Sequence, residues 1–175
     1  GLVAAIAKHH GVKTENIMIA AGSGEILDVC CSALLHNDRK IVGSEPSYTI
    51  LYNNASNLKA DTIKIPLLAD YRQDIPALIK ATKRNHRDVG FVYLCSPNNP
   101  TGRIVTKDEV RQLVESIPED VPVLTDEAYH HYVEDPAYAT SVPYVLEGRK
   151  AWAPRRPPTG PTSRLRSPRR RCSPR

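Results

Sequence analysis

Aromatic and sulfur-containing residues are scarce in this 175-residue chain, which has one Phe, one Trp, one Met and four Cys. The cysteines Cys30, Cys31, Cys95 and Cys172 show neither the pairing of a metal site nor the framework of a secreted domain. Cys30 and Cys95 lie in apolar runs, so we expect buried thiols and a reducing, cytoplasmic setting. No apolar run approaches the roughly 20 residues of a membrane span, and no signal peptide is expected.

Acidic residues are absent from the last 25 positions. All 19 lie within residues 1–150, together with 16 of the 24 Lys and Arg, so that part carries a formal charge of −3. Residues 151–175 contain eight Arg and six Pro. Proline removes ladder donors and little apolar surface offsets the cost of ordering, so we expect a disordered basic Arg/Pro-rich tail. Gly1 falls inside an apparent helical pattern, and we therefore expect the chain to be a fragment.

In the first 125 residues, short apolar runs alternate with longer segments that have the periodicity of amphipathic helices. This alternation favours an α/β fold in which helices cover both faces of a mostly parallel sheet. Strands are predicted at 17–20, 40–43, 61–65, 89–95 and 121–125, and helices at 25–36, 47–57, 74–83 and 106–117. The last helix begins with a capping box formed by Thr106 and Glu109. The paired histidines lack metal-ligand spacing, so we predict no metal site.

The first chemical candidate is the turn Gly22-Ser23-Gly24-Glu25, which joins the first predicted strand to the first long helix. Small residues and free N–H groups at a helix start favour an anion such as phosphate. The alternative is a tight turn in which Ser23 caps the helix. The turn lacks the third glycine of a dinucleotide fingerprint and the lysine of a P-loop.

The second candidate is Tyr48, which follows Glu45-Pro46-Ser47 at the end of the strand 40–43. An aromatic ring at this edge can stack on a planar heterocycle. The alternative reading is ordinary packing of a tyrosine at a strand end.

A stronger pair of motifs follows two buried strands. Residues 96–102 read Ser-Pro-Asn-Asn-Pro-Thr-Gly, a rigid turn that leaves the Asn99 amide able to bind a ligand oxygen. Residues 126–129 read Asp-Glu-Ala-Tyr. Burial of Asp126 at a strand end is costly unless a cation or several donors accompany it, and a protonated ring nitrogen would supply that partner. The carboxyl edge of such a sheet is where ligands bind.

Together these motifs resemble the large domain of the fold-type I pyridoxal-phosphate-dependent aminotransferases of class I/II, most closely the histidinol-phosphate aminotransferase branch. The resemblance covers residues 1–149 and implies part of a three-layer αβα domain that binds pyridoxal 5'-phosphate. It implies that Ser23, Gly24 and Glu25 hold the cofactor phosphate through backbone amides and that Tyr48 stacks on the pyridine ring. It further implies that Asn99 and Tyr129 bind the ring hydroxyl oxygen and that Asp126 pairs with the ring nitrogen.

The chain departs from this family after residue 150. Members hold the cofactor on a lysine as a Schiff base, roughly thirty residues after the aspartate, where this chain has its Arg/Pro tail. Lys150 is the one lysine after Asp126 and stands in the wrong context. The phosphate-binding arginine and the small domain are also missing. We therefore expect residues 1–150 to be an incomplete cofactor-binding domain, the chain to be inactive, and the tail to reflect a frame shift.

The implied activity is amino transfer between an amino acid, or an amino-alcohol phosphate, and a 2-oxo acid. Within the same superfamily, a decarboxylase or a β-lyase would use the same cofactor contacts. From a different class, the basic tail could bind RNA or DNA through charge alone. The resemblance also implies a homodimer, and we expect no membrane partner.

Overall fold

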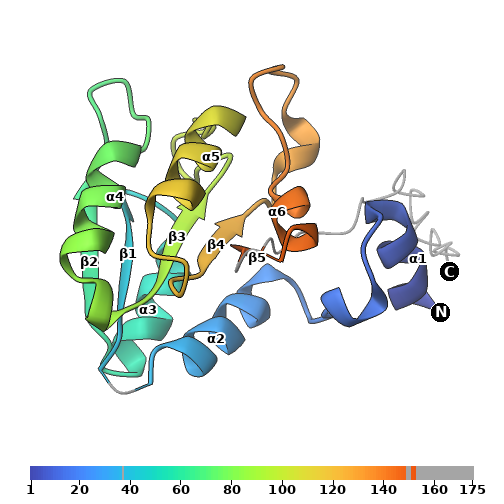
Figure 1. Ribbon diagram of the computed structural model, residues 1–175, viewed down its shortest axis with the longest axis horizontal. Coiled ribbons are helices and arrows are strands. Elements are labelled where there is room, and N and C mark those ends of the chain that lie inside the picture. The colour runs from blue at the N-terminus through green and yellow to red at the C-terminus, as the bar shows by residue number, and fades with distance from the viewer. Residues whose placement is uncertain (37, 149–150, 153–175) are drawn as a thin grey trace, which may run out of the picture.

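The computed structural model describes residues 1–36, 38–148 and 151–152, which form a parallel sheet covered by helices on both faces (Figure 1). The strand order is β2-β1-β3-β4-β5, and every neighbouring pair runs parallel. This confirms the α/β prediction. The strands are β1 Lys40–Glu45, β2 Thr62–Pro66, β3 Val89–Cys95, β4 Val123–Asp126 and β5 Ala151–Trp152.

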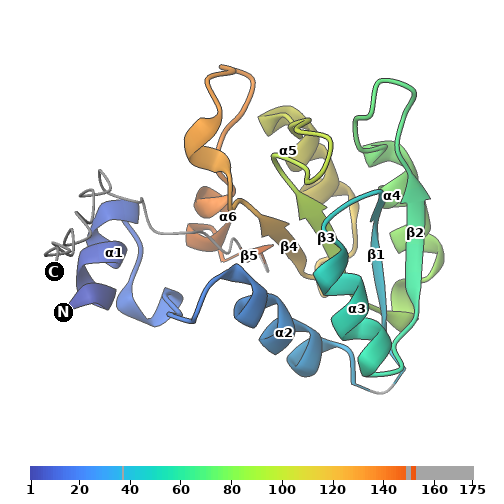
Figure 2. The same ribbon diagram turned by 180° about the vertical axis from the view of Figure 1, so that it is seen from behind.

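Six α-helices lie in the described part of the chain, and the layers are clear when the molecule is seen from behind (Figure 2). Helices α2 and α3 cover one face of the sheet, and α4 and α5 cover the other. Three 3-10 turns complete the elements, at Thr14–Asn16, His86–Asp88 and His130–Tyr132. The helices are α1 Leu2–His10, α2 Ser23–Leu34, α3 Thr49–Asn57, α4 Ile75–Arg84, α5 Lys107–Ser116 and α6 Val142–Leu146.

Strand β3 lies at the centre of the sheet and separates two apolar cores. All seven of its residues are buried, as expected for a strand covered on both faces. Phe91 and Tyr93 point into the core beneath α2 and α3, whereas Val92 and Leu94 point into the core beneath α4 and α5. This alternation follows from the two-residue period of a strand.

Local sequence signals set the helix starts of the second layer. Thr106 and Glu109 form the predicted capping box at the start of α5, and the Asp74 side chain accepts a hydrogen bond from the Ala77 amide at the start of α4. Each cap satisfies backbone donors that the first helical turn leaves without an internal acceptor.

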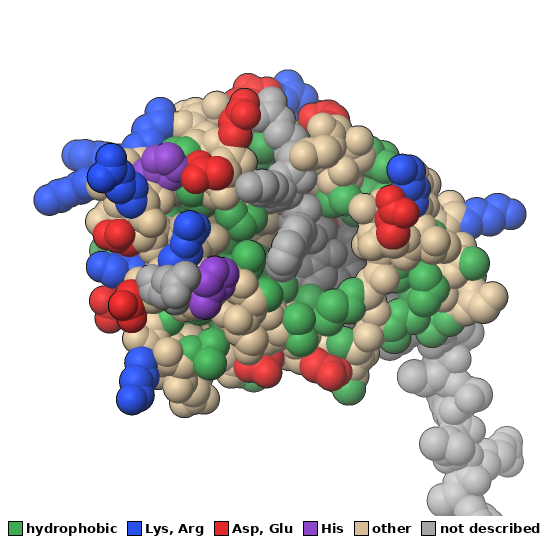
Figure 3. Space-filling view, turned by 60° about the horizontal axis from the view of Figure 1, so that its bottom comes forward, with side chains coloured by type: hydrophobic (Ala, Val, Ile, Leu, Met, Phe, Trp, Pro, Cys, Tyr) green, Lys and Arg blue, Asp and Glu red, His purple; other side chains and the backbone are tan. Residues whose placement is uncertain are grey.

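The predicted strand at 17–20 is wrong, because these residues form no strand in the structure. Ile17 has extended backbone angles, but extended chain becomes a strand only where another strand supplies ladder partners, which periodicity cannot reveal. The segment joins α1 to α2 instead, and Met18 and Ile19 are about half exposed. Apolar side chains gather on the right of Figure 3, the side on which α1 lies in Figure 1.

The predicted tail differs from the structure at its start. Ala151 and Trp152 pair with Val123 and Leu124 and so extend the sheet, which is possible because the first proline of this stretch comes later, at Pro154. Lys150 and the predicted disorder of residues 153–175 lie outside the described residues. Within the described part of the chain, none of the helices has the length and apolar character needed to span a bilayer.

Candidate functional site

Asp126 is the last residue of β4, and its side chain is 3% exposed. The Ala128 amide donates to Asp126 Oδ1 at 3.1 Å, and the Tyr93 hydroxyl donates to Oδ2 at 3.2 Å. Leu124, two residues earlier, belongs to the core under α2 and α3, so Asp126 lies on that face of the sheet. Both donors are uncharged, so these bonds orient the carboxyl group without neutralising it.

Cys95 is the register partner of Asp126 on β3. Burial, and then the nearby Asp126, raise the pKa of its thiol to about 11, while the backbone N–H of Asn99 and the Tyr93 and Ser47 hydroxyls act in the opposite direction. The thiol is therefore neutral at pH 7. Its neighbours show that the end of β3, the start of the next turn and the end of β4 meet at one point.

Two adjacent asparagines occupy different environments in the turn 96–102. Asn98 is 2% exposed, and its Nδ2 donates to the Pro46 carbonyl at 3.1 Å and to Thr101 Oγ1 at 3.0 Å. Asn99 is partly exposed, and its side-chain amide has no hydrogen-bond partner among the described residues. The predicted ligand amide, Asn99, is thus available to a ligand, whereas Asn98 holds the turn.

Tyr48 lies at this edge because the preceding residue, Ser47, is hydrogen-bonded there. The Ser47 hydroxyl donates to Asn98 Oδ1 at 2.8 Å and so ties the loop after β1 to the turn after β3. Tyr48 and Asn99 each follow one member of that bonded pair. The Tyr48 ring is partly buried and packs on the core under α2 and α3, the face on which Asp126 lies.

A groove of about 620 Å³ lies between the turn after β3 and the segment after β4. Asn99 and Tyr129 both line it, which joins the two motifs at the carboxyl edge of the sheet. Tyr132, 78% exposed, lines it further out. Asp126 lies deeper and does not line this groove.

The turn 22–25 forms the start of α2. Gly22, not Ser23, is the N-cap residue, so the alternative in which Ser23 caps the helix is wrong. Gly22 has a φ of 105°, which a residue with a side chain rarely adopts. A Cβ atom at Gly24 would meet nothing within 4 Å. Open space therefore lies beside Gly24. The first amides of α2, those of Ser23, Gly24 and Glu25, lack intrahelical acceptors because they stand at a helix start.

The Glu25 carboxylate partly occupies this helix start, because its Oε2 accepts a hydrogen bond from the Ala21 amide at 2.5 Å. Leu27, one turn further along, packs in the same core as Tyr93 and Leu124. The helix start thus belongs to the layer that covers the Asp126 face.

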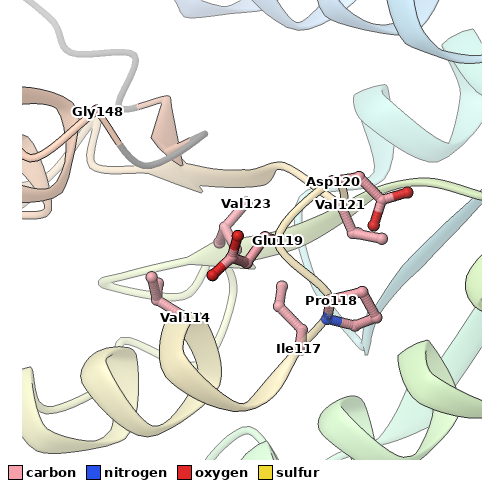
Figure 4. Close-up of a pocket in the computed structure, with 8 residues that line it drawn as sticks. All are labelled: Val114, Ile117, Pro118, Glu119, Asp120, Val121, Val123 and Gly148. Atoms are coloured by element: carbon pink, nitrogen blue, oxygen red, sulfur yellow. The ribbon is translucent and has the colours of Figure 1, made fainter.

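A second hollow, of about 500 Å³, lies away from these residues (Figure 4). It is formed by the end of α5 and the chain that leads into β4, with Glu119 and Asp120 among its lining residues. None of the predicted site residues lines it. Among the described residues, no group of three or more His, Cys, Asp or Glu side chains could hold a metal ion.

Sequence reasoning assigned no role to Tyr93, Ser47 or Asn98, although each contacts a predicted site residue or its neighbour. The signal for Tyr93 was available, since a tyrosine within a buried strand must find a partner for its hydroxyl. The motif and the family resemblance pointed to Asn99, but nothing in the sequence indicated that Asn98 holds the turn.

Residues 2–153 match the family model described as aminotransferase class I and II. A histidinol-phosphate aminotransferase of Geobacillus thermodenitrificans is 34% identical over 142 residues, which are 81% of this chain and 38% of that protein. The chain thus spans about two fifths of the length of this curated relative.

Solved structures agree with this match. A histidinol-phosphate aminotransferase of Sinorhizobium meliloti, solved in complex with pyridoxal 5'-phosphate, is 26% identical with a TM-score of 0.72, over 78% of this chain and 36% of that one. The L-threonine-O-3-phosphate decarboxylase of Porphyromonas gingivalis shares the fold at 18% identity, with a TM-score of 0.67 over 86% of this chain and 44% of that one.

Proposed function

Because the chain belongs to the class I and II aminotransferase family, we propose that it forms the cofactor-binding part of a pyridoxal-phosphate-dependent aminotransferase. The reaction would move an amino group between an amino acid, or an amino-alcohol phosphate, and a 2-oxo acid. The similarity to histidinol-phosphate aminotransferases supports the phosphate-bearing substrate.

The observation that carries the proposal is Asp126, a buried carboxyl group at the end of a central strand. Uncharged donors hold both of its oxygens, which suits a carboxylate that pairs with a protonated ring nitrogen. Its neighbour Cys95 is neutral at pH 7 because burial raises the thiol pKa to about 11. A cationic heterocycle would therefore meet a negative charge that the thiol does not compete with.

The remaining predicted residues fit other parts of the same cofactor. The Asn99 amide and the Tyr129 hydroxyl would bind the ring hydroxyl oxygen from the groove wall that they share. Tyr48 would stack on the ring from the loop after β1. The amides of Ser23, Gly24 and Glu25 would bind the phosphate, which the open space at Gly24 supports. For this to happen, the Glu25 carboxylate must remain turned toward Ala21.

The chemistry that the cofactor supplies when bound is an electron sink for the substrate carbon that loses its proton. Asp126 would keep the ring nitrogen protonated, which that role requires. In this family a lysine carries the cofactor and moves the proton. Lys150 is the one lysine after Asp126 in the printed sequence, and its context does not match. We therefore propose that the 175 residues bind the cofactor without completing the reaction.

The homodimer and the cytoplasmic setting are also proposals. The exposed apolar side chains of Met18, Ile19 and Val29 support a covered face on the side of α2. The free, buried thiols of Cys30, Cys31 and Cys95 support a reducing compartment.

The test is a titration of the purified chain with pyridoxal 5'-phosphate, followed by the absorbance and circular dichroism of the cofactor. We expect saturable binding, and we expect Asp126→Asn to weaken it about tenfold to a hundredfold, the range for a lost bond to a charged group. Asp108→Asn, at an exposed position in the first turn of α5, is the matched control and should bind like the wild type. No saturable binding, or equal binding by Asp126→Asn, would refute the proposal.

A further inference from the structure

Tyr93 lies one strand away from Asp126, with its side chain fully buried. Its hydroxyl group is 3.2 Å from Asp126 Oδ2, while the Ala128 amide holds Oδ1. One donor lies on β3 and the other in the turn that follows β4, and they reach different oxygens. Together they fix the plane of the carboxyl group relative to the carboxyl edge of the sheet.

The tyrosine side chain is itself held in place. Its ring packs in the core with Leu27 and Leu124 and meets the ring of Tyr52 edge-on, with centroids 6.1 Å apart and planes at 85°. The Tyr52 hydroxyl does not compete for Asp126, because it donates to the Ser44 carbonyl at 2.6 Å. The two tyrosines thus donate their hydroxyl groups to different acceptors.

The two titratable groups beside Asp126, the Tyr93 hydroxyl and the Cys95 thiol, are both neutral at pH 7. Burial, and then the nearby Cys95 and Asp126, raise the pKa of Tyr93 far above its ordinary value, so the phenol remains a donor at all working pH values. The Cys95 thiol is neutral at pH 7 for the same reason. Neither Tyr93 nor Cys95 therefore carries a charge at pH 7 beside Asp126.

We propose that Tyr93 is a positioning residue that holds the Asp126 carboxylate toward the ring nitrogen of the cofactor. The inference rests on the proposed function, in which Asp126 pairs with that nitrogen. It predicts a specific defect when the Tyr93 hydroxyl is removed, because the lost bond acts through Asp126 and should affect ligands only through their ring nitrogen. A defect of packing would weaken the binding of all ligands alike.

The experiment compares pyridoxal 5'-phosphate with its 1-deaza analogue, in which carbon replaces the ring nitrogen. The dissociation constants of both ligands are measured for the wild type, Tyr93→Phe, Tyr52→Phe and Asp126→Asn. We expect the wild type to prefer the natural cofactor, Asp126→Asn to lose that preference, and Tyr93→Phe to reduce it about fivefold to tenfold. Tyr52→Phe also loses a buried hydroxyl but should keep the full preference, so it is the matched control.

The outcomes separate the two proposals. A wild-type chain that binds both ligands equally would contradict the pairing of Asp126 with the nitrogen and hence the proposed function. A preference that disappears in Asp126→Asn but persists undiminished in Tyr93→Phe would overturn only the role of Tyr93. An equal loss of affinity for both ligands in Tyr93→Phe would overturn it too, because it would indicate a role in packing alone.

Should Tyr93→Phe fail to fold, the wild-type chain still gives an answer by proton nuclear magnetic resonance. The hydroxyl proton of Tyr93 is shielded from solvent by burial. We expect its resonance to shift when the natural cofactor binds and to stay in place with the deaza analogue. No shift with the natural cofactor, or the same shift with both ligands, would refute the inference.

Discussion

At the scale of single residues, the candidate site separates groups that hold the turn after β3 from groups that line the groove. Asn98 and Asn99 are chemically identical neighbours, yet only Asn98 is buried and bonded through its side chain among the described residues. The difference arises because Asn98 faces the loop after β1, where Ser47 and Pro46 meet its amide. Its neighbour lines the groove instead.

We predict that the two alanine variants affect different properties, Asn98→Ala the stability of the fold and Asn99→Ala the binding of the cofactor. Asn98→Ala leaves the Ser47 hydroxyl without its acceptor, and should lower the free energy of unfolding by about 1–3 kcal/mol. Asn99→Ala should change it by less than about 0.5 kcal/mol, as for other substitutions away from a bonded site, but should weaken binding of pyridoxal 5'-phosphate. Urea unfolding and a cofactor titration measure the two quantities. If the two variants were equally unstable, the division of roles would be incorrect.

At the scale of elements, a buried carboxylate links the end of β4 to the start of α6. Glu127 is fully buried, and it accepts hydrogen bonds from the Ser141 amide at 2.6 Å and from Thr140 Oγ1 at 2.9 Å. These bonds close the segment 128–139, which carries Tyr129 and forms one wall of the groove. Glu127 therefore closes the segment that forms the groove wall and does not itself line the groove.

We predict that Glu127→Gln loosens this segment without disturbing the sheet. The amide nitrogen of glutamine cannot accept a bond and would face a donor, at a local cost of about 1–3 kcal/mol. Hydrogen exchange should become faster at the amides of Ser141 and Val142 and stay unchanged in β3. Glu134→Gln, in the exposed part of the same segment, is the control and should exchange like the wild type. Unchanged exchange at Ser141 in Glu127→Gln would argue against the role of Glu127.

At the scale of the whole molecule, the sheet divides two cores, and the core under α2 and α3 contains the thiols of Cys30, Cys31 and Cys95. Burial raises their pKa values to about 11, about 12 and about 11. In the unfolded chain they titrate near the ordinary value of 9.0. Above pH 9 the unfolded chain therefore loses protons that the folded chain keeps.

We predict that the free energy of unfolding is constant with respect to these thiols below pH 9 and falls as the pH rises from 9 to 11. Each thiol can contribute up to about 1.4 kcal/mol per pH unit in this window. Urea unfolding at half-unit pH steps measures the slope. Cys30→Ala removes one titrating group and should give a shallower slope between pH 9 and 11. A stability that rises with pH in this window would contradict the burial of these thiols.

The sequence was sufficient for features that depend on residues close together in the chain. The apolar run at residues 89–95 predicted β3 at its observed bounds, and the Thr106–Glu109 capping box predicted the start of α5. The two motifs at residues 96–102 and 126–129 predicted that these segments meet at the carboxyl edge of the sheet, and residues of both line one groove there.

The tertiary structure decided what depends on pairs of residues far apart in the chain. It left the extended segment 17–20 without ladder partners, gave Ala151 and Trp152 such partners, and brought the Tyr93 hydroxyl to Asp126 across 33 positions. The physical reason is that periodicity and capping act over one or two turns, whereas strand pairing and the partner of a buried hydroxyl depend on which elements pack together.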